Sequence, residues 1–180
     1  MQITHPAADP RYPIGRIEFP HEPLTAERRE ELIERIAETP RLLREAVAGL
    51  DDAQLDTPYR DGGWTVRQLV HHIPDSHINS YTRFRLALTE DTPTIKPYDE
   101  AAWAKLPDTA MPIEASLELL EALHRRWVVL LRALDDDQWH RALKHPEMGP
   151  QTLERLLIIY AWHGPHHIAH ITALRDRMGW

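Results

Sequence analysis

Apolar residues recur at helical spacing in four long stretches of the chain, and no other feature of the sequence constrains the fold as much. The stretches cover about residues 25–50, 65–88, 113–134 and 152–178. An apolar stripe with a period near 3.6 residues indicates an amphipathic helix that buries one side. With 180 residues the chain is long enough for one core and short for two. We therefore predict an all-α fold, a four-helix bundle.

Prolines indicate where this bundle begins and bends. The first 24 residues contain five prolines and no apolar period, so we predict an extended N-terminal arm over residues 1–24 and a bundle domain over residues 25–180. Pro40 and Pro74 fall inside predicted helices and should bend them, and the first stretch is either one kinked helix or two short ones. The proline-rich residues 92–112 form a long connection that crosses an end of the bundle or wraps a side.

Two short acidic segments resemble each other. Leu50–Leu55 reads Leu-Asp-Asp-Ala-Gln-Leu, and Leu134–Trp139 reads Leu-Asp-Asp-Asp-Gln-Trp. Each follows a predicted helix and precedes a Thr-capped helix that bears histidines. Two interpretations stay open: acidic turns at helix ends that are alike by chance, or two helical hairpins that face each other.

The charge and hydropathy of the chain exclude two classes of partner. A formal net charge of −7 offers no basic face for nucleic-acid phosphates. The longest apolar run, residues 156–162, is too short to span a bilayer, and the N-terminus lacks the basic start and apolar region of a secretory signal. We therefore expect a cytoplasmic protein that binds neither nucleic acid nor membrane.

The histidines are the residues that point to a function. The chain has no cysteine, so a metal ion could be held only by His, Asp or Glu. Seven of the 12 histidines fall in two short segments, which favours a metal site over chance placement: His71, His72, His77 and His163, His166, His167, His170. The other five, which we interpret as surface or packing residues, are His5, His21, His124, His140 and His145.

Helical spacing selects ligands within the C-terminal cluster. His163 and His167 lie one turn apart and point the same way. His170 follows on that side, whereas His166 turns away. An open catalytic site uses three protein ligands, so another must come from a different helix, and the only comparable cluster is the first one.

The first cluster leaves the choice of that ligand open. His77 lies in the middle of the apolar stripe, where a core histidine bonded to a backbone carbonyl is more common than a metal ligand. Periodicity does not single out His72. No catalytic base stands out either, since the polar groups nearby are better interpreted as caps, turns or ion-pair members: Asp75, Asn79, Arg83 and the loop over residues 59–64. The His-Glu-x-x-His arrangement, which would supply a carboxylate base, is absent from the sequence.

Five stretches, spread over nearly the whole chain, carry a resemblance to a known family. They are Tyr12–Gly15, Leu55–Gln68, His71–Tyr81, Pro97–Glu100 and Trp162–Thr172. In these stretches the sequence resembles the DinB/YfiT superfamily of metal-binding four-helix bundles, and within it the YfiT-type metal-dependent hydrolases. The resemblance implies a metal site with one histidine on the second helix and a His-x-x-x-His pair on the last. Carried onto this chain, the ligands are His72, His163 and His167.

The same resemblance implies a function. We expect a metal-dependent hydrolase or, as in relatives that join bacillithiol-type low-molecular-weight thiols to electrophiles, a thiol S-transferase. One divalent ion per chain, zinc in first place with nickel or iron as alternatives, would activate water or the thiol. The substrate would be a small molecule and the assembly a homodimer. The alternative is a non-catalytic helical module in which a structural metal staples two helices together.

Overall fold

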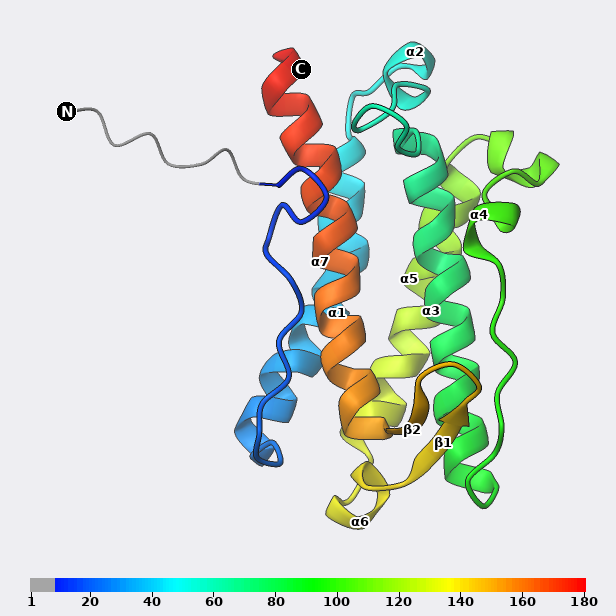
Figure 1. The fold of residues 1–180 in the computed structure, drawn as a ribbon. Coiled ribbons are helices and arrows are strands. Elements are labelled where there is room, and N and C mark those ends of the chain that lie inside the picture. The colour runs from blue at the N-terminus through cyan, green and yellow to red at the C-terminus, as the bar shows by residue number, and fades with distance from the viewer. Residues whose placement is uncertain (1–8) are drawn as a thin grey trace.

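The computed structural model describes residues 9–180, and residues 1–8, including His5, lie outside the described part. Four long helices dominate it: α1 (Ala26–Val47), α3 (Val66–Thr89), α5 (Glu114–Arg132) and α7 (Leu153–Met178). Between them lie the one-turn helices α2 (Asp52–Leu55), α4 (Glu100–Trp103) and α6 (Asp136–Trp139), the 3-10 helix η1 (Pro107–Ala110) and the strands β1 (Ala142–His145) and β2 (Gly149–Thr152). The long helices form a bundle (Figure 1), so the predicted four-helix bundle is confirmed.

The long helices begin and end where local chemistry satisfies their free backbone groups. Thr65 and Gln68 form a capping box at the start of α3. The Thr152 side chain accepts from the backbone N–H of Arg155 at the start of α7. Gly179 follows α7 in the left-handed conformation, with φ of 71°, which a residue without Cβ adopts at little cost.

Three prolines lie inside long helices without ending them: Pro40 in α1, Pro74 in α3 and Pro165 in α7. The first apolar stretch of the sequence is therefore one helix and not two. A proline has no N–H for the carbonyl four residues earlier, so each of these positions leaves one backbone oxygen without its usual helical partner. In α1 that oxygen belongs to Ile36.

The connections give the bundle an uncommon course. α1 packs against α5 and α7, and α3 packs against the same two helices. Figure 1 shows the segment after α3 returning along the outside of that helix, so that α5 runs in the same direction as α3. The long connection thus wraps a side of the bundle, which is one of the two courses left open by the sequence. The backbone N–H of Ile95 donates to the Lys144 carbonyl at 3.1 Å and holds this segment against β1.

Two apolar clusters fill the interior, and histidines lie between them. On α5, His124 falls between Leu120 of one cluster and Trp127 of the other. The same interval along α3 and α7 holds His77 and His163. Each apolar cluster is stabilised by burial of its own side chains, at about 25 cal/mol per Å². His77, His124 and His163 therefore form a polar layer between the two apolar clusters and belong to neither cluster.

The two similar acidic segments fold alike. α2 and α6 each begin with an Asp and Gln capping box, and each accepts a hydrogen bond from a buried arginine, Arg67 for α2 and Arg29 for α6. The two segments are therefore alike in local structure as well as in sequence. Periodicity does not predict these one-turn helices, nor the hairpin of β1 and β2 that precedes α7.

Residues 9–25 precede α1 and run along α7 (Figure 1). The indole N–H of Trp162 donates to the Gly15 carbonyl at 3.3 Å, and the Arg155 guanidinium lies 3.6 Å from the centre of the Phe19 ring. The division into an arm over residues 1–24 and a bundle domain over residues 25–180 stays a prediction. Within residues 9–180, no helix combines the length and the apolar character needed to cross a membrane.

Candidate metal centre

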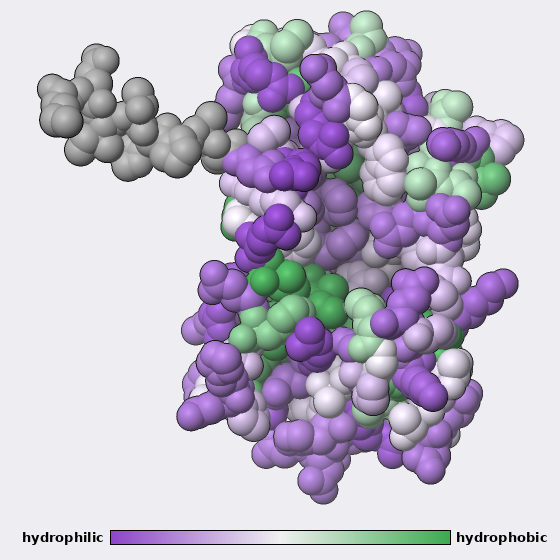
Figure 2. All heavy atoms as spheres, viewed as in Figure 1, coloured by the Kyte–Doolittle hydropathy of each residue, from purple (hydrophilic) through white to green (hydrophobic). Residues whose placement is uncertain are grey.

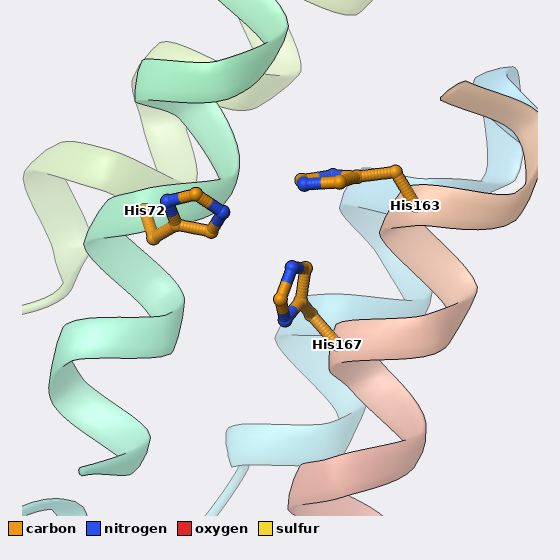
Figure 3. Close-up of side chains that lie close together, drawn as sticks. All are labelled: His72, His163 and His167. Carbon is orange, nitrogen blue, oxygen red and sulfur yellow. The ribbon is translucent and has the colours of Figure 1, made fainter. Parts of the chain in front are cut away.

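Side chains from α3 and α7 meet in a group of three histidines. His72 on α3 and His163 and His167 on α7 each offer a ring nitrogen, and these nitrogens all lie within 4.8 Å of one another. Figure 3 shows the three rings around a common space, each with one nitrogen turned toward it. The structure thus brings together the three residues named from the family resemblance. We call them the primary histidine group.

Helix geometry explains how the group forms. His163 and His167 are one turn apart on α7, and their ring centroids are 4.5 Å apart. The His72 ring lies 5.3 Å and 4.9 Å from them, across the contact between α3 and α7. Periodicity within α3 could not choose His72, because the choice depends on how far α3 and α7 are shifted along each other.

Burial keeps these rings neutral. Desolvation lowers the pKa of His72 to about 4. It also lowers the pKa of His163 and of His167 well below the usual 6.5, and repulsion from neighbouring histidines adds to the effect. Trp64, at the end of the loop over residues 59–64, contributes to the burial with its ring 4.7 Å from that of His72. At neutral pH each ring therefore has a lone pair available for a cation.

A second histidine group lies further along α7. His166, His167 and His170 also offer ring nitrogens within 4.8 Å of one another. The Nε2 atoms of His166 and His170 are 3.2 Å apart, within hydrogen-bond distance, and the His166 ring stacks on Trp162 at 4.1 Å. A neutral His167 ring has one lone pair, so it can serve only one of the two groups.

The position of His170 differs from the expectation that it follows His163 on the metal-facing side. It shares that angular side of the helix, but seven residues place it about 10 Å further along the axis. Its ring packs against Tyr59 at 4.1 Å and pairs with His166, and it is outside the primary group. Helical spacing therefore predicts the side of the helix on which a residue lies, but it does not show whether two residues on that side are close enough along the axis to share an ion.

His71 points away from the primary group, although it is next to His72 in sequence. Its ring nitrogens lie 2.7 Å from the Ser116 hydroxyl and 3.1 Å from the Met111 carbonyl oxygen. Neighbouring residues on a helix differ by about 100° in direction, so the two rings face different elements.

The prediction for His77 was wrong about its partner. Its Nδ1 lies 2.8 Å from Nε2 of His124, and its Nε2 lies 3.1 Å from Nδ1 of His163. The backbone carbonyl in this network is that of Ile36, which His124 Nδ1 contacts at 2.7 Å. His77 is a fully buried core residue, as the spacing indicated, and His124 is more than a packing residue.

A cavity of about 490 Å³ adjoins the primary group. Its wall is formed by α3, α7, the hairpin of β1 and β2, and the segment at the start of α4. In Figure 2 the surface is hollowed in this region, with hydrophobic residues gathered at one side of the hollow. His163 belongs to the wall, whose other polar side chains are Ser76, Arg83, Tyr98, Asp99, Glu100, His145, Glu147 and Tyr160.

Three polar residues near the first histidine cluster were considered from the sequence. Arg83 lines this cavity, whereas Asp75 and Asn79 do not. Asn79 donates to the Asp75 carbonyl at 2.8 Å, within α3. Burial raises the pKa of Asp75 to about 6, and the negative charge of Asp108 adds to the shift.

Sequence reasoning missed Tyr98 and Glu100 as cavity residues. The Tyr98 hydroxyl is buried without a hydrogen-bond partner among residues 9–180, and Glu100, an exposed residue, lines the same cavity. Their stretch, Pro97–Glu100, was one of the five that carried the family resemblance, and this was the available signal.

Comparison with known families decides the relationship. A family model described as the DinB superfamily matches residues 24–171. The chain belongs to this superfamily. The matched range includes every residue of both histidine groups and of the cavity wall.

Relatives of this DinB-superfamily chain carry names that mention a metal. A protein from Bacillus cereus (strain 03BB102) named "Putative metal-dependent hydrolase" is 53% identical over 172 residues, which are 96% of this chain and 99% of the relative. A Bacillus anthracis protein of the same name is 52% identical with the same coverage.

Solved structures agree with the fold. YfiT from Bacillus subtilis, described as "a probable metal-dependent hydrolase with an unusual four-helix bundle topology", matches with a TM-score of 0.91 and 53% identity over 95% of this chain and 98% of that one. TT2238, described as a four-helix bundle protein, matches with a TM-score of 0.54 and 18% identity over 84% of this chain and 99% of its own. At 18% identity, the similarity to TT2238 is evidence only about the fold.

Proposed function

We propose that this protein is a metal-dependent enzyme in which His72, His163 and His167 hold one divalent ion per chain. The reaction is hydrolysis of a small molecule or transfer of a low-molecular-weight thiol to an electrophile. Zinc is the first choice of ion, with nickel or iron as alternatives, because imidazole suits all three. The names of the Bacillus relatives support the metal dependence and the hydrolytic chemistry.

The donor set fits such an ion. The primary histidine group offers three nitrogens within 4.8 Å of one another, all from rings that burial keeps neutral. A divalent cation bound by neutral ligands keeps its full charge, and when bound it lowers the pKa of a coordinated water toward about 7 or favours the thiolate form of a thiol. Three protein ligands are the number typical of catalytic zinc sites.

The observation that carries the proposal of an enzyme is the position of His163 on the cavity wall. A structural metal site is closed by four protein ligands, whereas a catalytic site keeps a position that a small molecule can reach. A cavity of about 490 Å³ is in the size range of small-molecule sites. This feature favours a catalytic centre over a metal that only staples α3 to α7.

The cavity also supplies groups that could bind and orient a substrate. Arg83 offers a fixed positive charge, and the hydroxyl of Tyr98 offers a donor with no partner among residues 9–180. Glu100 also lines the cavity, and its carboxylate is a candidate for the proton acceptor that the sequence left unidentified.

The test combines metal content with turnover. Purified protein is analysed for metals, and metal-depleted protein is titrated with zinc, nickel and iron(II). Hydrolysis of small esters and amides and transfer of small thiols are then assayed for wild type, His163→Ala and His167→Ala, with His71→Ala as the control. We expect about one ion per chain and metal-dependent turnover in wild type and in the control, and loss of both when His163 or His167 is replaced.

Two outcomes contradict the proposal in different ways. Absence of any uptake by wild type rules out the metal site. Uptake without turnover of any ester, amide or thiol favours the structural staple. The homodimer and the cytoplasmic location expected from the sequence stay predictions.

A further inference from the structure

Three histidines form a continuous line of hydrogen bonds through the interior of the bundle. The line runs from the Ile36 carbonyl on α1 to His124 on α5 at 2.7 Å, from there to His77 on α3 at 2.8 Å, and on to His163 on α7 at 3.1 Å. Each of the four long helices contributes one member. His77 is fully buried and His124 is 2% exposed, so water does not compete for these bonds.

The oxygen at the start of the line is available because of a proline. In a regular helix the Ile36 carbonyl would accept from the N–H of residue 40, but Pro40 has none. An unpaired buried carbonyl is costly, and the His124 N–H satisfies it. The irregularity in α1 therefore creates a fixed acceptor that faces α5.

That acceptor sets the direction of every bond in the line. A neutral imidazole has one N–H and one lone pair, and a carbonyl oxygen can only accept. His124 must therefore carry its proton on Nδ1, which leaves Nε2 to accept from His77 Nδ1–H. In the same way, His77 Nε2 accepts from His163 Nδ1–H. Burial lowers the pKa of His124 to about 4, so the first ring of the line is neutral at pH 7. The three hydrogen bonds then place one proton on Nδ1 of each ring.

We propose that His124 and His77 are positioning residues that fix His163 in the tautomer with its proton on Nδ1, so that the Nε2 lone pair faces the divalent ion. This inference rests on the proposed metal site. It assigns a role to two histidines that bind neither ion nor substrate.

The line is specific to one of the three proposed ligands. Nδ1 of His167 is buried without a hydrogen-bond partner among residues 9–180, so nothing comparable in that part of the chain holds its tautomer. A histidine whose proton is already on the nitrogen that faces away from the ion need not change tautomer when the ion binds. Partners of this kind typically change metal affinity by about 10- to 100-fold when removed.

A purely structural role is the competing explanation, because any buried polar group needs a partner. It predicts that removing His77 harms the protein no differently from removing another buried, hydrogen-bonded histidine. His71 is such a residue: it lies on the same helix, is 6% exposed and bonds to Ser116 and Met111. His71→Leu is therefore the matched control for His77→Leu.

The experiment measures tautomer and affinity separately. Two-bond 1H–15N correlation spectra of metal-free, 15N-histidine-labelled protein report which nitrogen of His163 is protonated, and chelator competition gives the zinc dissociation constant. We expect the Nδ1–H form in wild type. In His77→Leu we expect the Nε2–H form to appear and zinc affinity to fall about 10- to 100-fold, whereas His71→Leu keeps both wild-type values.

A conservative variant tests for rescue. In His77→Gln the amide oxygen can accept from His163 and the amide N–H can donate to His124, so the Nδ1–H form and most of the affinity should return. If His77→Leu does not fold, His124→Leu and His124→Gln test the same line of hydrogen bonds one step further from His163. The Nε2–H form of His163 should then appear, and zinc affinity should fall, in His124→Leu more than in His124→Gln.

The proposal is overturned by an Nε2–H tautomer of His163 in wild type, or by equal losses of zinc affinity in His77→Leu and His71→Leu. Failure of the proposed function looks different. Wild type then takes up no divalent ion, whatever the tautomer of His163, and the positioning role falls with it.

Discussion

Replacing Gly164 with Ala should destabilise the protein by forcing α7 away from α1. A Cβ at this position would lie 2.6 Å from Cγ2 and 2.8 Å from Oγ1 of Thr39 on α1, where ordinary contact begins at 3.4 Å. Thr39 is fully buried, and its hydroxyl donates to the Arg35 carbonyl at 2.9 Å, so the side chain has little freedom to turn aside. Overpacking of this kind costs about 1–3 kcal/mol.

The higher helix propensity of Ala opposes the collision in Gly164→Ala, so the sign of the stability change tests whether the collision occurs. Ala favours a helix interior over Gly by about 1 kcal/mol, so without the collision the substitution would stabilise α7. Thr39→Ala removes the two nearest atoms and leaves only the Cβ of residue 39, at 3.3 Å. The same change at Gly164 should therefore destabilise the wild-type background and become neutral or stabilising in the Thr39→Ala background.

Thermal melting followed by circular dichroism on the four proteins of this cycle measures the effect. The overpacking cost less the helix-propensity gain leaves a net loss of up to about 2 kcal/mol, which corresponds to a fall in Tm of up to roughly 8 °C for a chain of this size. A Gly164→Ala protein that melts at or above the wild-type temperature, or an equal loss in both backgrounds, would refute the close approach of α1 and α7. Zinc affinity should fall with stability in Gly164→Ala, because His163 moves with its neighbour.

Three further outcomes are expected. His163→Ala and His167→Ala should remain folded by circular dichroism at room temperature, because the two apolar clusters persist and the ion adds only about 3 kcal/mol when present at a hundredfold its dissociation constant; unfolding of either variant would contradict this. His166→Ala should keep its metal content in elemental analysis, and a loss equal to that of His167→Ala would favour the second histidine group. Because burial lowers the pKa of His124 from 6.5 to about 4, the unfolded chain binds a proton at this residue below pH 6.5 that the folded chain does not. The contribution of His124 to stability is therefore retained above that pH and falls by about 3 kcal/mol as pH drops toward 4. Denaturant titrations of wild type and His124→Gln across pH 4–8 should show a shallower decline in the variant.

The four long helices could be predicted because each carries its own evidence. The apolar period and the caps at Thr65 and Thr152 depend only on residues within one segment. The hairpin before α7 could not be predicted this way, because its strands are four residues each and one partner contains Pro150. The direction of α5 was also beyond reach, since residues 92–112 could have crossed an end of the bundle or followed its side.

The histidine site divides in the same way. The pairing of His163 with His167 follows from spacing on one helix, and the structure places the two rings together. His72 came from the family resemblance, since selection between His72 and His77 depends on the register of α3 against α7. The partner of His77 was missed because it depends on three residues of two other helices. Pro40 frees the Ile36 carbonyl on α1, and His124 on α5 reaches that carbonyl.

The hydrogen bond between His77 and His163 joins residues 86 positions apart in the chain. Closing so long a segment is slow and unfavourable until much of the apolar interior has formed. A growing chain that lacks α7 contains His72 and His77 but no group for an ion to occupy. Zinc would then recognise only the finished bundle: added during refolding, it should leave the folding rate unchanged and slow unfolding.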